Sequence, residues 1–174
     1  MVSTGNECKW RKITSKRIAL KSSEAKRILE EFEQKFPVFT ADHHNKHILE
    51  EVEVENGKLF LLDSKSFAVS TASGLFPSLL NEDVLKALPS ITVDMGAIPH
   101  VCNGADVMRP GIRTINGKFD SGAVLVVKDI KFGKSIGICV AEVSSETMQE
   151  MKKGKAARNV HYVGDVFWKA MKPE

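Results

Sequence analysis

Apolar residues in the first half of the chain follow a helical spacing in one segment and an alternating spacing in several others. Positions three and four residues apart predict an amphipathic helix over residues 22–35, with Ser22 or Ser23 as its cap and Pro37 as its end. Alternation predicts strands over residues 10–20, 49–55, 58–63 and 66–71, with a tight hairpin at Asn56-Gly57. A short helix over residues 82–88 follows Asn81 as its cap. We therefore expect a helix that covers a small antiparallel sheet.

The second half of the chain has many short apolar segments with glycines between them. We expect strands over residues 97–102, 112–116, 123–130, 135–143 and 160–169, with a hairpin at Asn116-Gly117. One helix is predicted over residues 145–153, closed by Gly154. Short strands separated by turns are typical of a small barrel. The change of pattern predicts an α+β protein with two domains, residues 1–89 and residues 90–174.

The composition of the 174-residue chain is that of a globular protein, with 43% hydrophobic and 27% charged residues. Its longest apolar runs, such as residues 123–127, fall far short of the roughly 20 residues of a transmembrane helix, and the N-terminus lacks the apolar core of a secretory signal. Cys8, Cys102 and Cys139 are widely spaced, which argues against a disulfide framework and a cysteine zinc site. We expect no membrane partner and a cytoplasmic location.

Charge is distributed unevenly along the chain. Residues 1–27 carry a net charge of +6, residues 28–89 a net charge of −6 and residues 90–174 a net charge of +3. The basic arm between Lys9 and Arg17 could follow an RNA backbone, or it could be a charged edge strand that discourages aggregation. The acidic residues within 50–55 should repel RNA, and they face either a protein partner or water.

The densest candidate for binding chemistry is the sequence GADVMRPGI at residues 104–112. Gly104 would let the backbone approach a ligand closely, and Gly111 would allow a turn that other residues strain. Arg109 and Arg113 would place two guanidinium groups beside that turn, where they suit phosphates or base edges. The alternative is a purely structural turn that closes the barrel. The segment is neither a GxGxxG motif nor a P-loop.

Three segments resemble the PUA domain of RNA-binding proteins: VDMGAI at residues 93–98, NGADVMRPGI at residues 103–112 and KGKAARNVHYVGD at residues 153–165. The order of the motifs is most similar to the malignant T-cell-amplified sequence family, whose relatives include archaeal stand-alone PUA proteins and the PUA part of ligatin. FPSLL at residues 76–80 extends the resemblance upstream, so that it covers nearly the whole chain.

The resemblance implies an α+β pre-PUA domain followed by a PUA β-pseudobarrel. It further implies binding of structured RNA, either a tRNA acceptor end or small-subunit ribosomal RNA. The expected setting is the small ribosomal subunit, in translation initiation or ribosome recycling, together with a protein partner. Carried onto this chain, the RNA-binding residues are Gly104, Ala105, Asp106, Arg109, Gly111 and Arg113. Lys155 and Arg158 are further RNA-binding candidates through their positive charge, or they are solvated surface groups.

Several other side chains could either contact RNA or have an ordinary surface or core role. Lys131, Lys134 and Lys169 add diffuse positive charge for RNA, or they are ordinary solvated surface groups. Tyr162, Phe167 and Trp168, expected in the last strand, stack on a base or close the barrel core.

Metal binding and catalysis find little support in the sequence. His43, His44 and His47 could form a metal site, but no clear fourth ligand accompanies them, and a polar loop is the simpler interpretation. Asp94 and Asp106 lack a neighbouring base or nucleophile, so we expect no enzyme activity and no cofactor. Two alternatives to a translation factor remain: an accessory subunit that delivers RNA to a modification enzyme, and a protein-interaction module.

Overall fold

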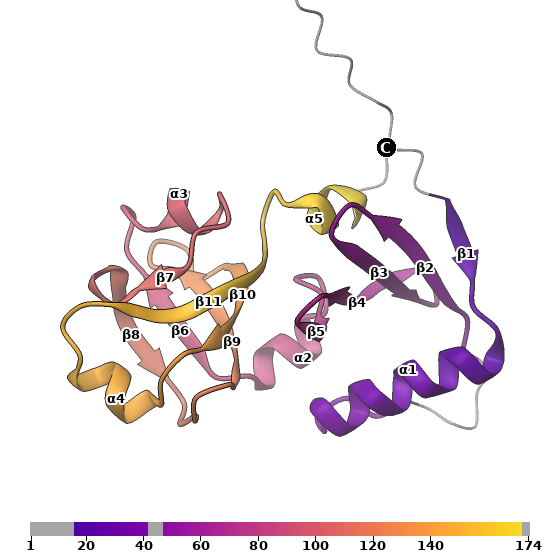
Figure 1. Ribbon diagram of the computed structural model, residues 1–174, viewed down its shortest axis with the longest axis horizontal. Coiled ribbons are helices and arrows are strands. Elements are labelled where there is room, and N and C mark those ends of the chain that lie inside the picture. Colours follow the sequence, from indigo (N-terminus) through magenta and orange to yellow (C-terminus); the bar gives the residue numbers. More distant parts are fainter. Residues whose placement is uncertain (1–15, 42–46, 172–174) are drawn as a thin grey trace, which may run out of the picture.

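The computed structural model describes residues 16–41 and 47–171, whose strands form two sheets that lie side by side along the long axis (Figure 1). The first sheet is antiparallel and its five strands follow one another in chain order. They are β1 (Arg17–Ala19), β2 (Leu49–Val54), β3 (Gly57–Leu62), β4 (Lys65–Thr71) and β5 (Gly74–Pro77). Part of the strand expected over residues 10–20 lies outside the described residues, and β5 was not expected.

Helix α1 (Ser22–Lys35) covers one face of this sheet, as predicted (Figure 1). Its apolar stripe buries Ile28, Leu29 and Phe32 against residues of β2, β3 and β4. The Phe32 ring lies 4.3 Å from that of Phe67, centroid to centroid. The expected serine cap was wrong: Lys21 occupies the N-cap position and no side chain caps the helix.

Helix α2 (Glu82–Ala87) leads into the second sheet, whose six strands have the order β7-β11-β10-β9-β6-β8. Only the β6–β9 pair is parallel among the described strands. The strands are β6 (Ser90–Val93), β7 (Val107–Met108), β8 (Ile112–Asn116), β9 (Val124–Asp129), β10 (Ser135–Ala141) and β11 (Lys155–Tyr162). They curl around a core that includes Ile91, Leu125 and Val127, and helix α4 (Ser145–Glu150) adds Met148 to it. The α+β fold with a barrel-like second half is therefore confirmed.

Parts of two expected strands are helical in the structure. Residues 97–102 form helix α3 (Ile98–Val101), because the Asp94 carboxylate accepts the Ala97 N–H at its start and Pro99 occupies its first turn. The last strand ends at Tyr162, and Val166–Met171 form helix α5. Asp165 caps α5 by accepting the Trp168 N–H. Phe167 and Trp168 are thus helical rather than stranded.

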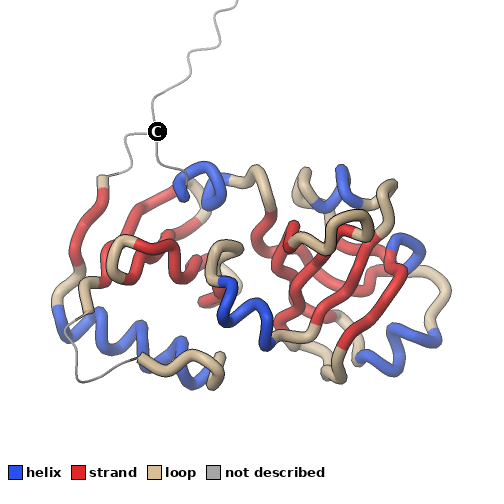
Figure 2. The backbone as a smooth tube through the Cα atoms, turned by 180° about the vertical axis from the view of Figure 1, so that it is seen from behind, coloured by secondary structure: helices blue, strands red, loops and turns tan. Residues whose placement is uncertain are grey.

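Helix α5 returns from the second sheet to the first, where it lies against β2 and β3 (Figures 1 and 2). Phe167 is buried in a core cluster that joins residues of both sheets. His161, fully buried on β11, accepts the Leu79 N–H at Nε2 (3.4 Å) and donates from Nδ1 to Asp165 (2.7 Å). The division of the chain at residues 89 and 90 stays a prediction, but this last helix packs on the first sheet.

Candidate nucleic-acid interface

A pocket of about 460 Å³ opens where α3 and the segment after it meet β7. Its walls are mostly apolar and include Ala97, Val101 and Val107, while Met108 is half exposed at the pocket. Its polar side chains are those of Asp94, His100 and Asp106. The remaining lining residues are Gly96, Ala105, Pro110 and Gly111. The pocket thus unites two of the sequence segments singled out above, residues 93–98 and 103–112.

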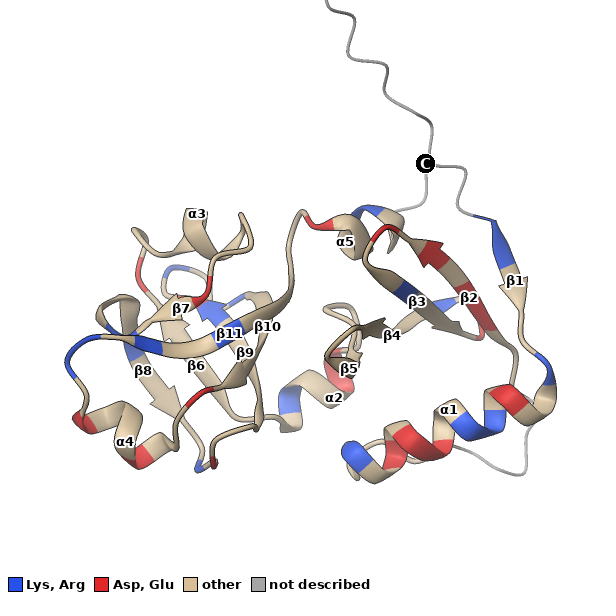
Figure 3. Ribbon diagram, in the orientation of Figure 1, with Lys and Arg blue, Asp and Glu red and all other residues tan. Residues whose placement is uncertain are grey.

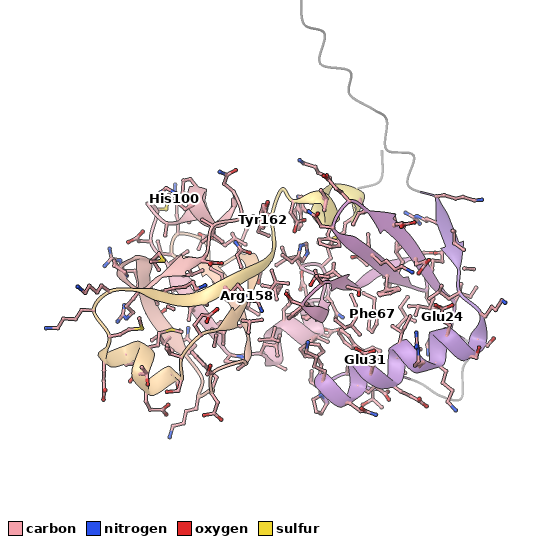
Figure 4. The ribbon with its side chains drawn as sticks, in the orientation of Figure 1. Glu24, Glu31, Phe67, His100, Arg158 and Tyr162 are labelled. Atoms are coloured by element: carbon pink, nitrogen blue, oxygen red, sulfur yellow. The ribbon has the colours of Figure 1, made fainter. Side chains whose placement is uncertain are left out.

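Position 104 requires a glycine for two reasons, its backbone conformation and the close approach of the Tyr162 side chain. The φ of Gly104 is +86°, and a Cβ there would lie 3.0–3.2 Å from ring and hydroxyl atoms of Tyr162. Figure 4 labels Tyr162 on β11 and His100 on α3, at the same end of the second sheet. Gly104 and Ala105 are exposed, so this loop presents its backbone to solvent. Tyr162 supports the glycine turn, a role that the sequence did not reveal.

Asn159 fixes the same loop from β11. Its side-chain amide donates to the carbonyls of Val101 and Ala105, both at 3.0 Å, and its backbone N–H donates to the Asp106 carboxylate at 2.9 Å. The sequence did not reveal this role of Asn159, although the residue lies inside the motif at residues 153–165. Its buried Oδ1 has no partner within the described part of the chain. Asp106 therefore ties the loop to the sheet.

Charges near the loop are balanced. Lys155 lies 3.3 Å from the Asp106 carboxylate and 3.7 Å from that of Glu142, and Arg158 lies 4.0 Å from Glu142. Arg158 also donates to the Ser73 hydroxyl, at 2.9 Å, and so links the second sheet to the β4–β5 turn. Figure 3 shows the basic residues of β11 in blue along one strand. Lys155 and Arg158 are thus partly engaged by protein groups.

Arg109 and Arg113, the two predicted arginines, differ in their surroundings. Arg109 is half-buried, and it donates from Nε to the Met148 carbonyl (2.6 Å) and from Nη1 to the Ile112 carbonyl (3.0 Å). Arg113 is exposed and pairs with the Asp94 carboxylate at 2.6 Å. The hydrogen bond from the Ala97 N–H lowers the pKa of the Asp94 carboxyl group, and the positive charge of Arg113 lowers it further. Arg109 therefore fastens the loop to α4, while Arg113 lies free of the core beside the pocket.

Gly111 is needed for a reason other than the one expected. It lacks the positive φ of a strained turn, and it lies in a 3-10 turn over Arg109–Gly111. A Cβ at this position would come within 2.8 Å of the Ala97 Cβ. The glycine therefore allows the loop to pack closely on the start of α3, and this contact shapes the pocket wall.

The alanine variants of Arg109 and Arg113 should differ in stability. The sequence alone predicts little loss of stability for either alanine variant, but the contacts of Arg109 change that expectation. Arg109→Ala should lower the free energy of unfolding by about 2 kcal/mol, because hydrogen bonds from a charged group are lost. Arg113→Ala should leave the urea midpoint almost unchanged, since its ion pair is exposed. Equal midpoints for the two variants in urea denaturation would contradict this assignment.

Other features from the sequence do not join the pocket. His43 and His44 lie outside the described residues, and His47 binds the Asp63 carboxylate at 2.7 Å. Over residues 16–41 and 47–171, the structure contains no group of three or more potential metal ligands. Most of the basic arm also lies outside these ranges, and in the acidic segment Glu51 pairs with Lys58. No helix in the described part of the chain is long and apolar enough to cross a membrane.

Comparison with known proteins shows sequence similarity along most of the chain. Residues 89–163 match the model of the PUA domain. An uncharacterized protein of Methanocaldococcus jannaschii is 33% identical over 156 residues, which cover 88% of this chain and 95% of the relative. Malignant T-cell-amplified sequence 1 of Rattus norvegicus is 36% identical over 84 residues, covering 47% of this chain and 46% of that protein. Translation machinery-associated protein 20 of Saccharomyces cerevisiae is 25% identical, and the match covers 64% of this chain and 65% of that protein.

Solved structures share the architecture. A PUA-domain structure from Aeropyrum pernix, determined as a tartrate complex, has a TM-score of 0.74 at 23% identity and covers 90% of both chains. A conserved PUA domain protein from Thermoplasma acidophilum has a TM-score of 0.68 at 28% identity, covering 90% of this chain and 100% of that one. Both matches extend over the two sheets, so the first half and the barrel recur together.

Proposed function

The chain belongs to the family of PUA-domain proteins that includes the malignant T-cell-amplified sequence proteins, and we propose that it binds the unpaired end of a structured RNA. The family membership agrees with the resemblance of the three sequence motifs. The observation that carries the proposal is the pocket between α3 and β7, built from two of those motifs. The RNA classes that fit are a tRNA acceptor end and an exposed segment of small-subunit ribosomal RNA.

The pocket has the chemistry for a base rather than for a phosphate. Its apolar walls, with Val101, Val107 and Met108, suit the faces of an unstacked base. Asp94 and Asp106 are already paired with Arg113 and Lys155, and their carboxylates can still accept hydrogen bonds from exocyclic amino groups, as acidic side chains do with cytosine. Cytosine and adenine carry such groups, so a single-stranded CCA end is a fitting ligand.

Phosphate contacts would come from the groups around the pocket. Arg113 and Lys155 pair with the two carboxylates of the pocket, and the exposed backbone of Gly104 and Ala105 adjoins them. Arg158 lies further along β11, toward the β4–β5 turn. Because acidic partners already neutralise part of this charge, we expect only about three phosphates to be engaged, which corresponds to a slope of roughly −2 in log affinity against log salt for a single strand. Affinity would then depend strongly on the base in the pocket.

The cellular setting that we propose is translation. The name of translation machinery-associated protein 20 places that relative in the translation machinery, and this chain covers 65% of its length. We extend the setting to this chain as a non-catalytic, cytoplasmic factor that acts with the small ribosomal subunit and a protein partner in initiation or recycling. Co-purification distinguishes this role from an accessory subunit, because ribosomal subunits would accompany a translation factor and a single enzyme would accompany an accessory subunit.

Binding to a tRNA acceptor minihelix tests the proposal. The affinity should fall at least tenfold when the single-stranded CCA end is removed, because the pocket then loses its base. Fluorescence anisotropy at two salt concentrations measures both this loss and the salt slope. Equal and weak binding of the two minihelices would reject recognition of the 3′ end, and the ribosomal RNA reading would then be tested with isolated small subunits.

A further inference from the structure

The β9–β10 loop, residues 130–134, displays an aromatic ring between two lysines. The Phe132 side chain is 69% exposed, more than any other large hydrophobic residue in the described ranges. The Nζ atoms of Lys131 and Lys134 lie 5.1 Å and 5.9 Å from its ring centroid. A single exposed phenylalanine is unremarkable on a protein surface, but one that is bracketed by cations has the two groups that a nucleotide requires, a stacking face and phosphate partners.

The loop is held rigidly in this shape. The buried Asp129 carboxylate accepts the backbone N–H groups of Phe132 (2.6 Å) and Lys134 (2.9 Å). The backbone N–H of Asp129 donates to the Lys134 carbonyl, and the Asp129 carbonyl accepts the Gly133 N–H. Gly133 itself has a φ of +66°. The donated N–H groups lower the pKa of Asp129, so the carboxylate is ionised near neutral pH. A loop that is ordered in advance loses little conformational entropy when it binds a ligand.

A basic pocket continues the surface from this loop. It measures about 410 Å³ and lies between α2 and the ends of β9 and β10. Lys86, Lys128 and Lys134 line it, and its acidic side chain, Glu82, pairs with Lys86 at 3.2 Å. The net charge of these lining residues is therefore positive. A polyanion complements this positive charge. An apolar partner without acidic groups would instead bury the three lysine ammonium groups without a counter-charge, which is unfavourable.

We propose that the β9–β10 loop and the adjoining lysine pocket form a second binding surface, which stacks an unpaired base on Phe132 and holds the neighbouring phosphates of single-stranded RNA. This surface is separate from the α3–β7 pocket. The Ile130 N–H bonds to the Val93 carbonyl, one residue before Asp94, so both surfaces lie at the same end of the second sheet. The ligand class is set by stacking and charge, so we expect little sequence preference.

A short oligouridylate without a CCA end tests this surface, because it does not offer the amino groups expected in the other pocket. Phe132→Ala should weaken its binding at least fivefold, and Phe132→Trp should retain or raise the affinity, since a larger ring still stacks. Lys131→Gln combined with Lys134→Gln should make the salt slope shallower by about 1–1.5, the contribution of two lost phosphate contacts. Val38→Ala, which trims an exposed side chain in the first half of the chain, is the matched control.

The outcomes distinguish this proposal from the proposed function. Loss of oligouridylate binding in Phe132→Ala with unchanged discrimination between minihelices with and without CCA supports two separate surfaces. Unchanged oligouridylate affinity in Phe132→Ala overturns the proposal, whatever the minihelix result. If Phe132→Ala keeps its oligouridylate affinity but self-associates less than the original protein in sedimentation, the loop is a protein contact. The RNA proposal for the loop is then wrong.

Discussion

His161→Leu is expected to lower the free energy of unfolding by about 3 kcal/mol, the largest loss of stability that we predict. The imidazole is fully buried where the two sheets meet, and both of its nitrogens are used. Since Nε2 accepts the Leu79 N–H, the proton lies on Nδ1 and is donated to Asp165. Leucine fills a similar volume but leaves a buried N–H and a carboxylate oxygen without this partner, so the cost is mainly one of unsatisfied polar groups.

Urea denaturation followed by circular dichroism measures this loss. His100→Leu is the matched control, because His100 is an exposed histidine on α3 and its replacement should shift stability by less than about 0.5 kcal/mol. The His161 variant should also loosen α5, since Asp165 both binds His161 and caps that helix. A loss below about 1 kcal/mol would show that the buried bonds contribute little to the junction between the sheets.

Met108→Asp is expected to weaken binding of the CCA-bearing minihelix at least tenfold, which equals about 1.4 kcal/mol. Met108 lines the α3–β7 pocket and is 49% exposed, so the substitution leaves the core intact. The new carboxylate would remove an apolar contact and add a third negative charge to Asp94 and Asp106. A base would then bind beside an excess of acidic groups, and its neighbouring phosphates would be repelled.

The minihelix without CCA should bind the Met108 variant and the original protein alike, because it does not reach the pocket. Val38→Asp is the control: it places the same charge on a similarly exposed side chain in the first half of the chain, and it should leave both affinities unchanged. If Val38→Asp weakens binding as much as Met108→Asp, the effect is one of overall charge, and the pocket is not the binding site.

The long periodic elements could be predicted from the sequence because their own residues determine them. Helix α1 has the predicted bounds, and the hairpin at Asn56-Gly57 joins β2 and β3 as expected. The short helices α3 and α5 could not be predicted in the same way. Each depends on an aspartate that accepts a backbone N–H three residues later, Asp94 and Asp165, and the apolar residues alone fit a strand equally well.

The sequence singled out a segment that contributes to a pocket, but it did not reveal the internal roles of its residues, and RNA binding there stays a prediction. The sequence pointed to residues 104–112, and of these residues 105–108, Pro110 and Gly111 line the pocket, whereas Gly104 and Arg109 do not. It could not show that Arg109 turns its guanidinium onto two carbonyls, because only the position of α4 determines that contact. Asn159 was missed for the same reason: its partners, Val101 and Ala105, lie more than 50 residues earlier in the chain.

Amide chemical-shift mapping with a CCA trinucleotide tests the central claim most directly. The claim is that the α3–β7 pocket holds an unpaired RNA base. We expect the largest shifts at Ala97, Ala105 and Met108, with smaller shifts at Asn159, and little change on the first sheet. Large shifts confined to the β9–β10 loop or to the first sheet, with an unperturbed pocket, would contradict the claim.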